Sequence, residues 1–170
     1  MARNIEIKAA IDSVEALLQT VAGIADEGPV EIRQDDTFFN CDAGRLKLRR
    51  FSADAGELIF YRRADRQGPK ESFYLRASTT APAVLRESLA LAYGVSGHVS
   101  KHRTLFLAGR TRIHLDRVEG LGDYLELEVV LADGEAAAAG EREARSLMQA
   151  LRVESARLVD VAYVDLLARR

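Results

Sequence analysis

The chain has 170 residues, of which 48% are hydrophobic and 29% are charged. These values fit one well-packed domain spanning residues 1–170 and exclude extensive disorder. The formal net charge of −2 excludes a strongly basic composition, so neither nucleic acid nor a membrane surface is expected as a partner.

The single cysteine and the start of the chain bear on location. Cys41 has no second cysteine with which to form an intramolecular disulfide, so a reducing compartment is compatible. Met1 leads directly into a strand pattern, with no apolar signal core behind a basic start. No uninterrupted apolar run reaches membrane-spanning length. We therefore expect a cytoplasmic protein.

The first half of the chain alternates between apolar and polar residues, the pattern of half-buried β-strands. A strand is expected at residues 4–9. Asp12 and Glu15 then resemble a capping box at the start of a helix that Gly23 can close. Gly28-Pro29 is typical of a turn. Further strands are expected at residues 30–39, 45–49, 57–63 and 71–77, with turns at 54–56 and 66–69.

The second half of the chain contains both helices and strands. Pro82 suits the first turn of a helix that Gly94 ends. Two later segments have apolar residues at helical spacing, 135–151 and 158–167. Strands are expected at 99–107, 111–118 and 124–131. Short turns between the strands favour one mostly antiparallel sheet of about eight strands with three or four helices.

Residues 124–131 show most clearly how the strands distribute charge. Leu125, Leu127 and Val129 share one face, whereas Glu126 and Glu128 share the other. The other charged strand faces carry Glu6, Lys8, Arg45, Lys47, Arg49, Arg62, Lys101, Arg103, Arg112, His114 and Asp116. A sheet closed into a barrel, with charge inside and helices outside, accounts for both kinds of face. Such a lumen must be wet or filled by a ligand, because burying many unpaired charges costs too much.

The chemistry of these faces favours a metal and a polyanion. Carboxylates two residues apart on a strand can share a hard cation such as Mg²⁺ or Mn²⁺. Converging lysines and arginines suit linked phosphates, and their number favours a triphosphate over a single phosphate.

Simpler interpretations stay open at this point. Each charged strand, taken alone, is more typical of a solvated face, or of ion pairs across an open sheet. His98, His102 and His114 show no zinc-ligand spacing, which is typical of surface or structural histidines. Cys41 has no identifiable activating partner and is expected to be inert.

A set of short motifs nevertheless resembles a known family in its order and spacing. It is similar to the CYTH family, the triphosphate tunnel metalloenzymes, which include class IV adenylate cyclases, thiamine triphosphatases and inorganic tripolyphosphatases. Each motif is weak alone, whereas the ordered set is specific and covers essentially the whole chain. The motifs are Asn4-Ile5-Glu6-Ile7-Lys8, Gln34-Asp35-Asp36-Thr37-Phe38-Phe39, Leu46-Lys47-Leu48-Arg49, Lys101-His102-Arg103, Leu115-Asp116, Leu121 to Glu128, and Ala162 to Leu167.

The resemblance implies an α+β fold: an eight-stranded antiparallel closed barrel, the triphosphate tunnel, with helices packed outside. It also implies a divalent cation, Mg²⁺ or Mn²⁺, and a small-molecule triphosphate in the lumen. The implied metal ligands are Glu6, Glu126 and Glu128, with Asp116 as a further acidic candidate. The implied phosphate-binding residues are Lys8, Lys47, Arg49, Arg62, Lys101 and Arg103, of which Lys8, Arg49 and Lys101 are also the catalytic candidates.

One position departs from the family pattern. The first strand of the family carries Glu-x-Glu-x-Lys, and here the first glutamate is Asn4, which brings no charge. We expect an adenylate-cyclase-like activity that converts ATP to cyclic AMP and pyrophosphate. A tripolyphosphatase or thiamine triphosphatase is the alternative among enzymes, and a non-catalytic nucleotide- or polyphosphate-binding module is the alternative outside them. A homodimer is left open.

Overall fold

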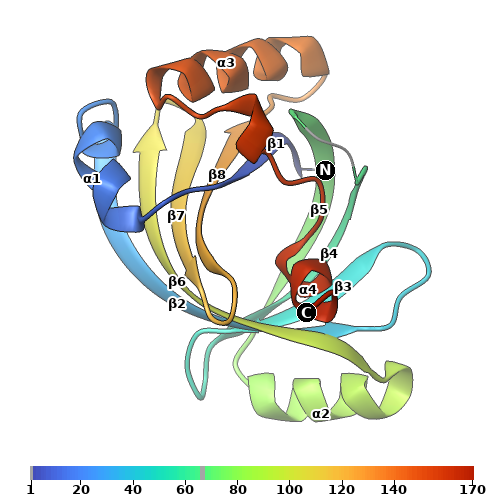
Figure 1. The fold of residues 1–170 in the computed structure, drawn as a ribbon. Helices are drawn as coiled ribbons and strands as arrows, with labels where there is room; N and C mark the ends of the chain where they lie inside the picture. The colour runs from blue at the N-terminus through green and yellow to red at the C-terminus, as the bar shows by residue number, and fades with distance from the viewer. Residues whose placement is uncertain (1, 66–67) are drawn as a thin grey trace.

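Eight antiparallel strands close into a barrel in the computed structural model, which describes residues 2–65 and 68–170 (Figure 1). Around the barrel the strands follow the order β1-β5-β4-β3-β2-β6-β7-β8, and the pairing of β8 with β1 closes the ring. The predicted antiparallel barrel is therefore confirmed. The strands are β1 (Ala2–Ala10), β2 (Glu27–Phe39), β3 (Arg45–Arg50), β4 (Gly56–Arg63), β5 (Lys70–Thr79), β6 (Val95–Ala108), β7 (Thr111–Val118) and β8 (Gly122–Val130).

Helices pack on the outside of this ring, as Figure 1 shows for α1 and α3. The helices are α1 (Val14–Ala22), α2 (Pro82–Tyr93), α3 (Ala137–Ala150) and α4 (Tyr163–Ala168), with a 3₁₀ turn, η1, at Ser155–Arg157. The main core lies between α1, α3 and the outward apolar faces of β1, β7 and β8. Gly140 lets α3 approach β1 closely, because a Cβ there would lie 2.7 Å from side-chain atoms of both Ile5 and Leu131. Apolar residues thus cover the outside of these strands and leave their polar faces inside.

The C-terminal segment closes one end of the barrel. The backbone N–H of Val159 donates to the carbonyl of Lys8 at 2.9 Å, and Lys70 Nζ donates to the carbonyl of Asp160 at 2.7 Å. Tyr163 then packs with Phe38 and Tyr124 in a second, smaller core. Because residues 158–162 pair with the barrel rather than with one another, the helix expected at 158–167 begins only at Tyr163.

Some local expectations are wrong in detail. Ser13, not Asp12, caps α1: its hydroxyl accepts from the N–H of Ala16 at 3.1 Å, and Asp12 pairs with Arg157 instead. Gly28-Pro29 does not end the strand, because it lies within β2 where the register with β6 shifts. The turn expected at 66–69 falls partly on residues 66 and 67, outside the described residues. Among the described residues, no helix is both long and apolar enough to span a membrane.

Candidate functional site

The barrel encloses a cavity of about 290 Å³. Alternation along each strand turns Asn4, Glu6 and Lys8 of β1 into this cavity while the residues between them pack outward. More basic than acidic side chains line it. The basic ones are Lys8, Lys47, Arg49, Arg63, Arg76, Lys101, Arg103 and Arg112, and the acidic ones are Glu6, Asp36, Glu57, Glu126 and Glu128.

Most of the predicted site residues meet in this cavity, although their roles stay predictions. Those that line it are Glu6, Lys8, Lys47, Arg49, Lys101, Arg103, Glu126 and Glu128. Arg62 and Asp116 are the exceptions. Arg62 lies on the outer face of β4, where its guanidinium stacks near the rings of Phe60 and Phe73. Its neighbour Arg63 points inward and pairs with Glu6 at 3.1 Å, so the expected lumen position of Arg62 is corrected to Arg63.

Asp116 lies behind the cations rather than at the cavity surface. Its side chain is fully buried and accepts from Lys101 at 2.9 Å, from Arg103 Nε and Nη2 at 2.6 Å, and from the hydroxyl of Tyr163 at 3.1 Å. Although burial opposes ionisation, Arg103 and Lys101 hold the pKa of Asp116 well below its ordinary value. With both oxygens bound in this way, Asp116 orients two cations and is not placed to bind a metal as expected.

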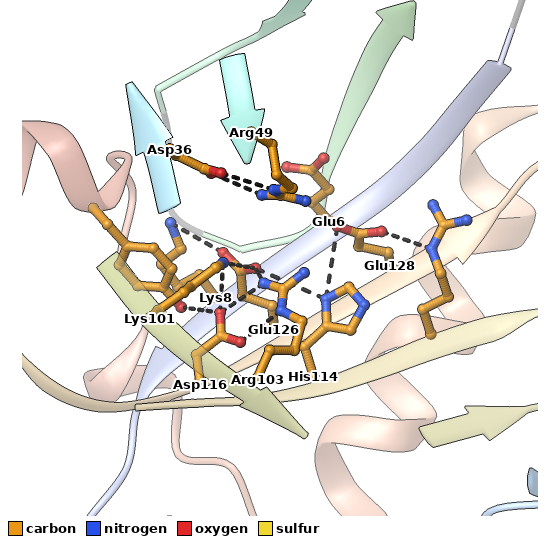
Figure 2. A network of polar contacts seen from close by, with 12 residues as sticks. Glu6, Lys8, Asp36, Arg49, Lys101, Arg103, His114, Asp116, Glu126 and Glu128 are labelled. Atoms are coloured by element: carbon orange, nitrogen blue, oxygen red, sulfur yellow. Dashed lines mark hydrogen bonds and ion pairs between the residues drawn. The ribbon is translucent and has the colours of Figure 1, made fainter. Parts of the chain in front are cut away.

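Asp36 holds the second pair of cations in the same manner. Its carboxylate accepts from Nε and Nη2 of Arg49 at 2.8 Å, as Figure 2 shows. It also accepts from Lys47 Nζ at 2.7 Å. Burial opposes the charge of Asp36, yet Lys47 and Arg49 keep its pKa far below the ordinary value. Burial also lowers the pKa of Lys47 to about 8. Buried aspartates therefore fix the direction of the cations that line the cavity.

The carboxylates of the cavity come from neighbouring strands in register. Glu6 lies directly opposite Glu128, and Lys8 lies opposite Glu126, across the β1–β8 pair. Burial and then the charge of Glu128 raise the pKa of Glu6. For Glu128 itself burial is outweighed by His114 and Arg112, and its pKa falls to about 2. Two facing carboxylates of this kind attract a cation.

Lys8 occupies the closed end of the cavity. Its Nζ lies 3.2 Å from Glu126 Oε1, donates to the carbonyl of Val161 at 3.2 Å, and sits 3.9 Å from the centre of the Tyr163 ring. Burial is the main reason that the pKa of Lys8 is lowered to about 8. Lys8 can therefore release or take up a proton close to neutral pH.

A cation could be held where β7 meets β8. His114, Glu126 and Glu128 offer ligand atoms that all lie within 4.8 Å of one another. Nδ1 of His114 is buried and has no hydrogen-bond partner among the described residues. Burial, followed by the charge of Arg103, lowers the pKa of His114. One imidazole and two carboxylates form a donor set that fits a divalent ion.

Sequence reasoning missed several residues of this site. Asp36 stood in a quoted motif without a role, and His114 was classed with His98 and His102, which are exposed and pair with Asp35 and Glu31. The alternation of Arg112, His114 and Asp116 is an available signal for His114, and the alternation of Gln34, Asp36 and Phe38, which all line the cavity, is one for Asp36. Tyr163 had none, because it reaches the site from a separate C-terminal segment.

Comparisons with known proteins agree with this architecture. The model of the CYTH domain matches residues 2–163. The PH1012 protein from Pyrococcus horikoshii OT3 has a TM-score of 0.85 at 21% identity, covering 96% of this chain and 98% of that chain. A candidate adenylate cyclase from Vibrio parahaemolyticus has a TM-score of 0.76 at 19% identity, covering 97% of both chains. An RNA triphosphatase from S. pombe has a TM-score of 0.54 at 12% identity, covering 95% of this chain and 86% of that chain. No curated protein matches.

Proposed function

The chain belongs to the CYTH family, and we propose that it is a metal-dependent enzyme that binds the triphosphate of a small molecule inside its barrel. One observation carries the proposal. Basic side chains of β3 and β6, the two strands that flank β2, line the same cavity as Glu126 and Glu128 of β8. A chain of linked phosphates with a divalent cation complements both sets of charge.

The two arginines are arranged to bind phosphate without leaving their aspartates. Arg49 and Arg103 each use Nε and Nη2 to bind a buried aspartate. Within the described residues, the Nη1 group of each arginine has no partner and remains for a phosphate oxygen. Lys47 and Lys101, which are bound to the same two aspartates, add positive charge beside them. This arrangement would hold a phosphate chain without reorganising the site.

Glu126 and Glu128 would hold the divalent cation. When bound, the cation would withdraw charge from the phosphoryl oxygens. Arg103 and Arg112 contact these glutamates at 2.5 Å and 2.8 Å and so fix the direction of their carboxylates.

The reaction we propose first is cyclisation of ATP. The ribose 3′-oxygen forms a bond to the α-phosphorus, the bond from that phosphorus to the bridging oxygen breaks, and pyrophosphate leaves. Arg49 and Lys101 would stabilise the charge on the phosphoryl oxygens. The unprotonated form of Lys8, whose pKa burial lowers to about 8, would accept the hydroxyl proton. The apolar side chains of Ile32, Phe51 and Leu105 also line the cavity and give a nucleobase a surface to contact.

A triphosphatase is the second candidate. In that reaction water attacks the terminal phosphorus and the bond to its bridging oxygen breaks. The same cations would serve, because they bind phosphates rather than the attached group, and an RNA triphosphatase shares the fold. A binding module without turnover is the third, because the uncharged Asn4 weakens the carboxylate set.

Product identification separates these candidates. The protein is incubated with ATP, thiamine triphosphate or tripolyphosphate, each with Mg²⁺ or Mn²⁺. Cyclic AMP with pyrophosphate supports the cyclase, whereas orthophosphate supports a triphosphatase. Tight triphosphate binding without products supports the binding module. Neither binding nor turnover with any of the three would reject the proposed function.

A further inference from the structure

His114 places a buried imidazole inside the barrel. Its side chain is 4% exposed, and its Nδ1 is unpaired among the described residues. Nδ1 lies 3.9 Å from Glu126 Oε2 and 3.8 Å from Glu128 Oε1. Figure 2 shows the ring turned toward these two glutamates.

These distances are too long for hydrogen bonds but suit ligands that share one ion. Leaving a buried nitrogen unpaired destabilises the folded state, so a partner for Nδ1 is expected. Two ligands on one divalent ion, with bonds of about 2.1 Å, stand roughly 3–3.5 Å apart. The three side chains therefore need only small movements to close on a cation.

Glu128 has an oxygen free for such a cation, whereas a cation at Glu126 would share an oxygen with Arg103 or Lys8. Arg112 Nε binds Glu128 through Oε2 at 2.8 Å, which leaves Oε1 on the side of His114. Arg103 Nη2 binds Glu126 through Oε2 at 2.5 Å, and Oε1 lies 3.2 Å from Lys8 Nζ. Outer contacts of this kind orient metal-binding carboxylates.

We propose that His114 gives a nitrogen ligand to the divalent cation held by Glu126 and Glu128, and that this ligand shifts the site's preference from Mg²⁺ toward ions such as Co²⁺ and Zn²⁺. Mg²⁺ prefers an all-oxygen shell, whereas imidazole suits the later first-row metals. Asn4 acts in the same direction, because it lines the cavity without adding a carboxylate that would favour a hard ion.

Metal affinity tests the proposal on the protein without a triphosphate. Co²⁺ and Mg²⁺ are titrated calorimetrically into the parent, His114→Gln and His102→Gln proteins. Losing an outer-shell partner alone costs about 10–100-fold in affinity, so His114→Gln should weaken Co²⁺ binding at least 10-fold. Mg²⁺ binding should change less than about twofold, because the glutamine amide still offers an oxygen. His102 is exposed and should matter for neither ion. Equal Co²⁺ affinity in the parent and His114→Gln proteins would overturn the proposal.

A second measurement does not depend on the His114→Gln variant. The parent is prepared with ¹⁴N- or ¹⁵N-labelled histidine, and pulsed electron paramagnetic resonance is recorded with protein in excess over Mn²⁺. We expect nitrogen coupling to Mn²⁺ that changes with the isotope and persists in His102→Gln. Coupling that is absent from the parent contradicts the assignment, whether or not His114→Gln folds.

The inference rests on the proposed function only for what the cation does in the reaction. Nitrogen coupling without turnover of any triphosphate would support His114 as a metal ligand and reject the proposed enzymatic function. Metal-dependent turnover without nitrogen coupling would support the enzyme and reject the ligand.

Discussion

Arg49 of β3 and Asp36 of β2 form a bidentate ion pair inside the barrel, with both N–O distances at 2.8 Å. The two residues are direct neighbours in the β2–β3 register, and Lys47 binds the same carboxylate. The cations of the cavity are therefore paired before any ligand binds. Repulsion among them, which the sequence alone implied for an empty lumen, is offset by buried aspartates.

Replacing Asp36 by Asn should destabilise the fold. The substitution leaves the partly buried Lys47 and Arg49 without their countercharge, and breaking a buried pair from one side costs up to about 3–5 kcal/mol. The neighbouring Asp35→Asn is the matched control, because Asp35 pairs with Arg50 at the surface, where a pair contributes about 0–1 kcal/mol. Urea unfolding at pH 7 measures both. Similar losses of unfolding free energy in the two variants would show that the Asp36 pair stabilises the fold no more than the exposed Asp35 pair.

The cost of Asp36→Asn should depend on pH. The folded-state pKa of Asp36 lies far below its ordinary value of 3.8, so its stabilisation is complete above pH 3.8 and declines as the pH falls further. The difference in unfolding free energy between parent and Asp36→Asn should therefore be constant from pH 7 to pH 5 and shrink toward pH 2. Unfolding curves at these pH values measure it. A difference that grows in acid contradicts the ion-pair explanation.

The sequence predicted the fold and most of the lumen because alternation is unambiguous in β1, β7 and β8. In β4 it is not: residues 58–61 are all apolar, so which of Arg62 and Arg63 faces inward could not be decided. The two glutamates near His114 lie on the next strand, β8. The β7–β8 register, which places His114 opposite Glu126, is a property of the folded sheet. A short motif within one strand does not show which residues lie opposite it on the neighbouring strand.

Arg49, inside the barrel, and Arg62, outside it, give a test of phosphate binding. Arg49→Ala should weaken triphosphate binding by about 1.5–3 kcal/mol, the range for a charge-assisted hydrogen bond. Arg62→Ala should leave it unchanged, because Arg62 lies outside the barrel. Calorimetry with a non-hydrolysable triphosphate measures both affinities. An equal loss in the two variants would indicate a general effect of charge rather than a contact in the lumen.

Glu128 should be required for metal-dependent turnover but not for folding. It faces the cavity, its pKa of about 2 keeps it ionised at neutral pH, and it belongs to the cluster with His114 and Glu126. Glu128→Ala should abolish activity with Mg²⁺ or Mn²⁺ while thermal unfolding remains cooperative. Glu119→Ala, at an exposed position after β7, is the control and should retain activity. Undiminished turnover in Glu128→Ala would remove its metal role.

Asn4 is the last position to test, because it stands where the family pattern has a glutamate. It is 2% exposed, its Oδ1 is unpaired among the described residues, and it lines the cavity two residues before Glu6 on the same strand face. Asn4→Glu would add a third carboxylate beside Glu6 and Glu128, where burial and then the charge of Glu128 already raise the pKa of Glu6. We therefore expect lower stability without metal and tighter Mn²⁺ binding in the absence of triphosphate.

Asn4→Gln distinguishes the effect of charge on Mn²⁺ affinity from the effect of side-chain length, because glutamine has the length of glutamate without its charge. Calorimetric titration of Mn²⁺ into the parent and both variants should show tighter binding only in Asn4→Glu, and thermal unfolding should show that Mn²⁺ restores the stability lost in that variant. Adding a non-hydrolysable triphosphate should narrow the difference, because its oxygens supply the missing negative charge. Equal gains in Asn4→Glu and Asn4→Gln would assign the effect to side-chain length. Unchanged Mn²⁺ affinity in Asn4→Glu would place Asn4 outside the metal site altogether.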